Sequence, residues 1–80
     1  MSAMNQRETA VSGWEIRTFR DKFSMPQRQL AKLLGVPQHR IVVWERDEKS
    51  VDERRAVVLR RMIDTADHLL ARRANPNWNL

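Results

Sequence analysis

Residues 27–46 constrain the fold more than any other part of the chain, because their pattern predicts two short helices joined by a tight turn. Ala31 is small, so the second helix can approach the first closely. Gly35 can turn the chain through a positive φ at low cost. Ile41 and Trp44 lie three residues apart and share one helix face, which can pack onto the first helix. The side chains that remain outside are Gln38, His39, Arg40 and Val43.

A capping box predicts another helix ahead of this segment. Ser12 and Glu15 have the spacing at which each side chain bonds the backbone N–H of the other, so a helix should begin at residue 13 or 14. Its pattern breaks before Pro26, and the next helix should run over residues 27–34. The third helix should open at Pro37 and end at residue 45 or 46. The core of these helices should contain Trp14, Ile16, Phe19, Phe23, Leu30, Leu34, Ile41 and Trp44.

The last helix should begin near residue 51 or 52, because Ser50 and Glu53 form a second capping box. Apolar residues then recur at helical spacing as far as Arg73, which favours one long helix. Two shorter helices separated near Asp64 are the alternative. Pro76 ends the pattern. We therefore expect a flexible arm over residues 1–11, one all-α domain over residues 12–74 and a short tail over residues 75–80.

The chain is short and basic. Its 80 residues allow one domain, and the formal net charge is +5. Twelve of the fifteen basic residues are arginine, whose planar guanidinium binds phosphate and base edges in a bidentate way that lysine cannot match. A basic surface alone could simply be solvated. Beside the two-helix pattern, nucleic acid is the better interpretation of the charge.

Several other classes of protein find no support in the sequence. There is no cysteine, and no apolar run approaches the roughly 20 residues of a membrane span. The N-terminal stretch lacks the apolar centre of a signal peptide, so we expect a cytoplasmic protein that binds no membrane. His39 and His68 are too far apart in the pattern to suggest a metal site. No nucleophile–base pattern or phosphate loop is present, so we expect neither an enzyme nor a cofactor.

A set of residues at fixed separations carries a family resemblance that covers about residues 13–63. The set consists of Ile16, Arg17, Arg20, Pro26, Gln27, Leu30, Ala31, Leu34, Gly35, Val36, Ile41, Trp44 and Glu45. In this the chain resembles the Cro/C1 repressor family of helix-turn-helix proteins, also called the xenobiotic-response-element family. The resemblance implies a compact, lambda-repressor-like helical bundle that binds double-stranded DNA. The segment from Gln38 onward would then be the recognition helix in the major groove.

The exposed side chains of that helix suit base recognition. Glutamine can bond adenine and arginine guanine in a bidentate way, histidine can donate to guanine, and valine can pack on a thymine methyl group. The resemblance places base reading at Gln38, His39 and Val43, while Arg40 could reach a base or a phosphate. The alternative is a helix whose polar residues merely solvate it. The expected phosphate contacts, each of which could also be only a solvated polar group, are Gln27, Arg28, Lys32, Arg46 and Lys49.

The resemblance also implies a structural ion pair and reveals two departures. In the family an arginine of the first helix meets the glutamate that ends the recognition helix, which here would pair Arg20 with Glu45. Pro37 stands where the family usually has serine or threonine, so a capping hydroxyl is lost. Asp47 stands where the family usually has glycine, although aspartate tolerates the left-handed region better than most residues.

The expected function is sequence-specific repression of transcription by a homodimer on an inverted repeat. The apolar stripe of the last helix is longer than a small bundle can cover, so it would form the dimer interface. The residues expected in that interface are Met62, Ala66, Leu69 and Leu70. One alternative is an antitoxin-like protein whose residues 69–80 fold on a partner protein, with DNA binding for autoregulation. Another is a binder of nucleic acid without sequence preference.

Overall fold

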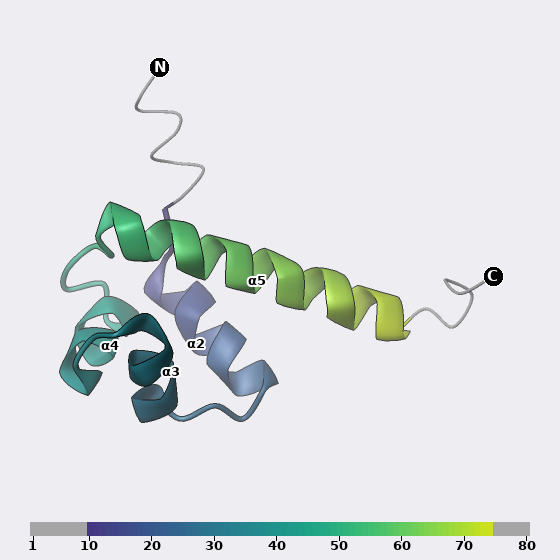
Figure 1. The fold of residues 1–80 in the computed structure, drawn as a ribbon, viewed down its shortest axis with the longest axis horizontal. Helices are drawn as coiled ribbons and strands as arrows, with labels where there is room; N and C mark the ends of the chain where they lie inside the picture. Colours follow the sequence, from purple (N-terminus) through teal and green to yellow (C-terminus); the bar gives the residue numbers. More distant parts are fainter. Residues whose placement is uncertain (1–9, 75–80) are drawn as a thin grey trace, which may run out of the picture.

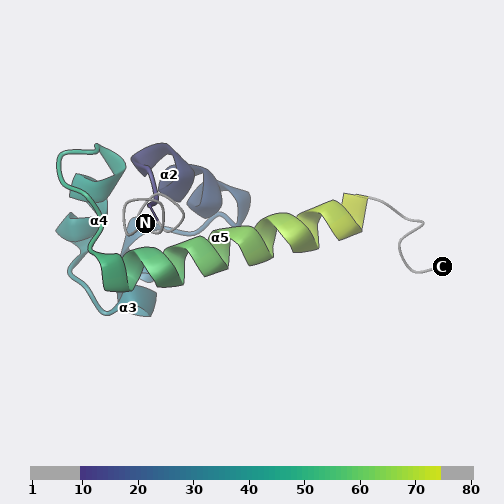
Figure 2. The same ribbon diagram turned by 90° about the horizontal axis from the view of Figure 1, so that it is seen from above.

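The computed structural model describes the chain from residue 10 to residue 74, with side chains up to residue 71. This range contains four α-helices and no strand: α2 (Gly13–Lys22), α3 (Gln27–Leu34), α4 (Gln38–Glu45) and α5 (Glu53–Ala74). The three short helices pack beneath one end of α5, and the other end of α5 projects beyond them (Figures 1 and 2). The prediction of an all-α bundle with an extended C-terminal helix is confirmed. Most of the expected arm, and the whole of the expected tail, lie outside the described residues.

Helix α2 begins as its capping box predicts. The backbone N–H of Glu15 donates to Ser12 Oγ at 3.1 Å, and the N–H of Ser12 donates to Glu15 Oε1 at 3.0 Å. The first residue of the helix, Gly13, lies against the end of α4. A Cβ atom built on Gly13 would stand 2.2 Å from the carbonyl oxygen of Glu45, so this helix crossing requires glycine.

The turn between α3 and α4 is formed by Gly35, which ends α3 in the left-handed region at φ +70°. The N–H of Val36 donates to the carbonyl of Ala31 at 3.0 Å and closes the turn. Pro26 and Pro37 are the N-cap residues of α3 and α4, and neither helix has a side-chain cap. The predicted loss of a capping hydroxyl at Pro37 is therefore confirmed.

Helix α5 differs from the prediction at its start. It begins at Glu53, and its cap is Asp52 rather than Ser50. The N–H of Arg55 donates to Asp52 Oδ2 at 3.2 Å, and the N–H of Ala56 donates to the Asp52 carbonyl at 2.8 Å. Aspartate is as good an N-cap as serine and lies two residues closer to the apolar stripe, so the second capping box does not form. The helix continues through position 64, which excludes two separate helices there.

The core lies between α5 and the three short helices. Two of the aromatic residues expected in it are exposed: Trp14 is 71 % exposed and Phe23 is 45 % exposed. Trp14 follows Gly13 in the first turn, and because Gly13 and Ile16 take the inward face, Trp14 points outward. Phe23 is the C-cap of α2 and rests edge-on against Phe19 at 5.4 Å between ring centroids. The buried apolar residues are Ile16, Phe19, Leu30, Ala31, Leu34, Ile41, Trp44, Ala56, Leu59, Ile63 and Ala66.

Candidate nucleic-acid interface

The outer surface of α4 carries the residues expected to read bases. Gln38, His39 and Arg40 are exposed in the first turn of the helix, and Val43 is half-buried one turn later. On the opposite face, Ile41 is fully buried and seals the helix onto the core. Four side chains of different chemistry, three polar and one apolar, therefore lie on the accessible side of one short helix. A helix of this kind can enter a DNA major groove.

A shallow hollow joins the start of α3 to the start of α4. It has a volume of about 560 Å³ and brings three of the five expected phosphate-binding residues beside the first expected base-reading residue. Gln29 also lines it, and sequence reasoning missed this residue, although Gln29 lies one turn before Lys32 and therefore on the same helix face. The residues that line the hollow are Pro26, Gln27, Arg28, Gln29, Lys32 and Gln38.

The first turns of α3 and α4 both leave backbone donors available. In α3 the carbonyl of Pro26 accepts from the N–H groups of Gln29 and Leu30, and in α4 the carbonyl of Pro37 accepts from the N–H of Arg40. The N–H groups of the first two residues of each helix lie ahead of these bonds. Together with the helix dipole they favour an anion, such as a phosphate oxygen, at each helix start.

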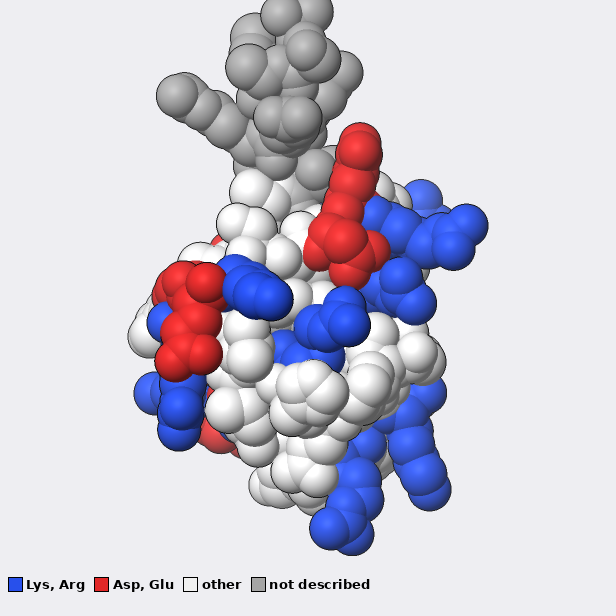
Figure 3. All heavy atoms as spheres, turned by 90° about the vertical axis from the view of Figure 1, so that its left-hand side faces the viewer, with Lys and Arg blue, Asp and Glu red and all other residues white. Residues whose placement is uncertain are grey.

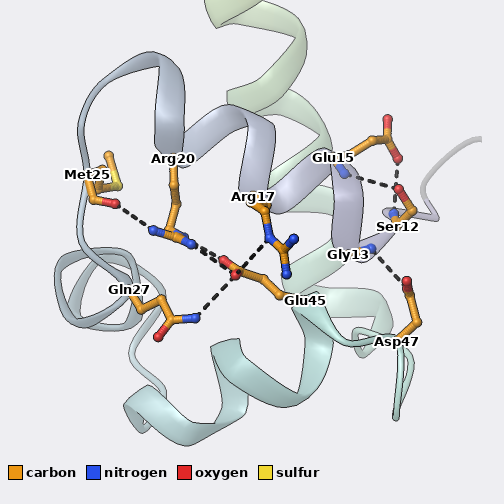
Figure 4. A network of polar contacts seen from close by, with 9 residues as sticks. All are labelled: Ser12, Gly13, Glu15, Arg17, Arg20, Met25, Gln27, Glu45 and Asp47. Carbon is orange, nitrogen blue, oxygen red and sulfur yellow. Dashed lines mark hydrogen bonds and ion pairs between the residues drawn. The ribbon is translucent and has the colours of Figure 1, made fainter.

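A buried carboxylate holds the other end of α4. Glu45 is 7 % exposed and is the one buried charged residue in the described part of the chain. Arg20 of α2 donates to both of its oxygens, with Nη2 at 2.9 Å from Oε1, and Gln27 Nε2 donates to Oε1 at 3.2 Å (Figure 4). Arg17 Nε adds an ion pair at 3.9 Å. The predicted pair of Arg20 and Glu45 is confirmed, and it belongs to a larger network.

This network ties three helices together. The hydrogen bond with Glu45, strengthened by the opposite charge, raises the pKa of Arg20 above its already high ordinary value, so the arginine stays charged. Arg20 Nη1 also donates to the Met25 carbonyl at 3.0 Å in the segment that leads to α3. Because one N–H of the Gln27 side chain is already engaged by Glu45, the backbone N–H of Gln27 is the better donor for a phosphate.

The turn after α4 is held by Asp47. This residue adopts the left-handed region at φ +57°, as its place in the family pattern predicts. Its Oδ1 accepts from the N–H of Gly13 at 2.9 Å (Figure 4), a bond that glycine could not supply. The departure from the usual glycine therefore gives the chain an additional link between α2 and the end of α4.

The remaining expected phosphate contacts lie in the loop before α5. Arg46 is exposed and its guanidinium stands 3.9 Å from the carboxylate of Glu48, while Lys49 is exposed. Figure 3 views the molecule from the end at which α4 lies in Figure 1. On that face lysine and arginine side chains border an uncharged surface, and two groups of acidic side chains interrupt them. On this face the positive charge therefore lies next to the uncharged area and is not spread evenly over the molecule.

The residues expected to join two chains lie between positions 62 and 70 of α5. Leu69 is 51 % exposed, and Met62 and Leu70 are half-buried. Ala66 is 5 % exposed because it packs into the core of its own chain. Of the four residues, Leu69 has the largest exposed fraction.

Two kinds of feature are absent from the described residues. No group of three histidine, aspartate or glutamate side chains between residues 10 and 71 is placed to hold a metal ion. No described helix is both long enough and apolar enough to cross a membrane.

Comparison with known proteins agrees with this geometry. A helix-turn-helix family model of the Cro/C1 type matches residues 16–65, which includes α3, the turn at Gly35, α4 and the first half of α5. No curated protein matches the chain significantly. No solved structure matches it significantly either.

Proposed function

Because the chain belongs to the Cro/C1-type helix-turn-helix family of DNA-binding regulators, we propose that it is a sequence-specific repressor that binds an inverted repeat as a homodimer. The observation that carries this proposal is the difference between the exposed first turn of α4 and its buried last residue. Its first turn presents Gln38, His39 and Arg40 to solvent, and its last residue, Glu45, is anchored in the core. Such a helix is held in place at its C-terminal end and presents, at its N-terminal end, side chains that can distinguish one base from another.

In the proposed complex, α4 lies in the major groove. Gln38 and His39 read base edges near its N-terminus, Arg40 reads a base or reaches the adjacent phosphate, and Val43 packs on a thymine methyl group. The start of α3 lies over the sugar–phosphate backbone, where Arg28 and Lys32 neutralise phosphates and the free N–H groups of the first turn donate to a phosphate oxygen of the DNA.

Three further residues complete the proposed DNA contacts. Gln27 contributes its backbone N–H to a phosphate, and Arg46 and Lys49 contact phosphates from the loop before α5. Arg46 would have to leave its weak contact with Glu48. An exposed ion pair of this length contributes little, so its loss costs less than a charge-assisted bond to phosphate provides.

In the proposed dimer, two copies of α5 meet with Leu69 and Leu70 at the centre and Met62 toward the bundle, and Ala66 is left out of the interface because it is buried in its own chain. Pairing about a two-fold axis would place the two recognition helices about one DNA turn, roughly 34 Å, apart. Binding at a promoter would then repress transcription by occupying the site.

Selection of bound sequences from random DNA tests the proposal. The expected result is a pair of inverted half-sites whose centres are separated by about 10 base pairs. Sedimentation at micromolar concentration should show a dimer. A selected pool without a shared sequence would contradict specific binding, and a monomer with a single half-site would contradict the dimer.

The alternative function, an antitoxin-like protein that also binds its own promoter, is favoured by one observation. Leu69 is half-exposed on α5 and lines an apolar groove together with Phe23, where a partner protein could cover it. Purification from the native host decides between the two. A partner protein present in equal amount, together with loss of that partner from the variant Leu69→Asp, would favour the alternative.

A further inference from the structure

Helix α2 carries three basic residues, and the fold engages them to different degrees. Lys22 Nζ lies 2.7 Å from Asp67 Oδ1 of α5. Arg20 donates to both carboxylate oxygens of Glu45. Arg17 has one ion pair with the described residues, at 3.9 Å from its Nε to Glu45 Oε1, and its side chain is 59 % exposed. The guanidinium of Arg17 is therefore the least engaged basic group of α2.

The carboxylate of Glu45 cannot balance both arginines. It carries one negative charge, whereas Arg17 and Arg20 each carry a positive charge, because arginine stays protonated in proteins. Arg20 bonds both oxygens, and Gln27 Nε2 adds a bond to Oε1 at 3.2 Å. Arg17 has the longest of these contacts, which is beyond hydrogen-bond distance. One positive charge is therefore in excess where the three helices meet.

No other carboxylate of the described residues pairs with Arg17. Asp21 lies one turn later on α2 and forms no ion pair with it. In the loop after α4, Asp47 accepts a backbone N–H of α2, and Glu48 stands beside Arg46. Carboxylates at longer range act through water and salt, which weaken their effect on an exposed guanidinium. The excess charge is therefore available to an anion from outside the chain.

This excess charge lies beside the start of α3. Arg17 Nε and Gln27 Nε2 contact the same oxygen of Glu45, so the two side chains are neighbours (Figure 4). Gln27 is the first residue of α3 and lines the hollow that also contains Arg28 and Lys32. The proposed complex places the sugar–phosphate backbone over this hollow. Arg17 therefore borders the proposed DNA surface, although it belongs to neither helix of the helix-turn-helix.

We propose that Arg17 is a further phosphate contact, through which α2 joins α3 in holding the DNA backbone; this role depends on the function proposed above. In the free protein the guanidinium lies near Glu45, and on DNA it donates to a phosphate oxygen next to the start of α3. The long ion pair that it leaves contributes little, whereas a guanidinium bonds phosphate in a charge-assisted and bidentate way. Arg20 and Gln27 still hold Glu45 in place.

The salt dependence of binding to a fluorescent DNA duplex of arbitrary sequence tests this role. Arg17→Ala should reduce the slope of log K against log salt by about one unit, and Arg17→Lys should retain the slope because it retains the charge. Lys22→Ala is the matched control, because it removes one positive charge from the side of the same helix that faces α5, and the slope should stay nearly unchanged. The urea unfolding midpoint of Arg17→Ala should equal that of the wild type.

Three outcomes would overturn the proposal. An unchanged slope in Arg17→Ala, with or without a loss of stability, would leave Arg17 only a structural role beside Glu45. Equal losses of slope in Arg17→Ala and Lys22→Ala would show an effect of net charge alone. On the selected operator, a neutral methylphosphonate at one position near α3 should abolish the effect of Arg17→Ala, and an effect that persists at every position would exclude a direct contact. If selection finds no operator, the proposed specific repression fails, while the arbitrary duplex still tests Arg17.

Discussion

The two ends of α4 are built for different tasks. At the C-terminal end, Glu45 is buried and bonded by Arg20 and Gln27, and its carbonyl packs against Gly13. At the N-terminal end, the side chains of Gln38 and the two residues after it are exposed, with no cap from Pro37. One helix of eight residues therefore keeps the residue that anchors the fold apart from the residues proposed to read bases. Changes at one end should unfold the domain, and changes at the other should alter only binding.

The largest effect is expected when the buried end loses its carboxylate. Glu45→Ala leaves the Arg20 guanidinium without its buried partner, and the loss of one member of such a pair costs about 3–5 kcal/mol. Urea unfolding followed by circular dichroism measures the change. Glu48→Ala, which removes an exposed carboxylate nearby, is the matched control and should change stability by less than about 0.5 kcal/mol. Similar losses in the two variants would refute the anchoring role.

The next effect concerns the contact between α2 and α4. Gly13→Ala would place a methyl group within 2.2 Å of a backbone carbonyl, and because backbone cannot move aside as a flexible side chain can, we expect a loss of about 2–3 kcal/mol. Alanine has the higher helix propensity, so propensity alone predicts the opposite sign. Thermal unfolding of the variant and the wild type shows which of the two effects is larger. A variant as stable as the wild type would mean that the two helices lie farther apart.

Sequence patterns predicted the parts of the molecule that depend on local chemistry. The Ser12 capping box, the turn at Gly35 and the inward face of α4 follow from neighbouring residues, and each is confirmed. The predicted start of α5 was wrong because two residues, Ser50 and Asp52, can each cap the helix. In the folded chain Asp52 is the cap. Local patterns cannot rank such near-equal alternatives.

Long-range contacts were the harder part of the site. No spacing rule links Gly13 to Asp47, whose hydrogen bond spans 34 residues. The hydrogen bond from Gln27 to Glu45 also could not be predicted from the sequence pattern, although the family resemblance did predict the partner of Arg20. The burial of Ala66 depends on how closely α5 approaches the core, which its helical spacing alone does not define.

At the exposed end of α4, we expect changes in binding without changes in stability. Gln38→Ala and His39→Ala should each weaken binding to the selected operator by about 1–3 kcal/mol and relax base preference at one position. Their urea unfolding curves should overlay that of the wild type, because neither side chain is buried. Fluorescence anisotropy with single-base operator variants provides the measurement. Unchanged affinity and footprint in both variants would contradict base reading by this surface.

A uniform effect is expected from the start of α3. Arg28→Ala removes one proposed phosphate contact, so it should weaken binding to every sequence alike and reduce the slope of log K against log salt by about one unit. Arg61→Ala, on α5 and outside the set of proposed DNA contacts, removes the same charge and should leave that slope nearly unchanged. If Arg28→Ala instead altered sequence preference at constant slope, Arg28 would have to contact a base.

The smallest effect concerns a contact that belongs to neither end of α4. The Arg60 guanidinium bonds the Glu15 carboxylate at 2.8 Å and lowers its pKa below the ordinary value of 4.5. A carboxyl with a lowered pKa in the folded state stabilises the fold above its unfolded pKa and loses that contribution as the pH falls through the folded value. Glu15→Gln should therefore be less stable than the wild type at pH 7, by under about 1 kcal/mol for this partly exposed pair.

The stability difference between Glu15→Gln and the wild type should shrink as the pH falls below about 4.5, where the carboxyl of the unfolded wild-type chain becomes protonated. Asp64→Asn provides the control, because Asp64 approaches the same guanidinium only to 3.7 Å with a largely exposed side chain, and its effect should be smaller at pH 7. Urea unfolding at intervals between pH 3 and pH 7 gives both curves. A difference for Glu15→Gln that stays constant over this range would mean that charge does not produce the effect. The Ser12 capping box would then account for the stability difference. A glutamine at position 15 can accept the N–H of Ser12 at any pH, but only when its amide oxygen is turned toward that N–H.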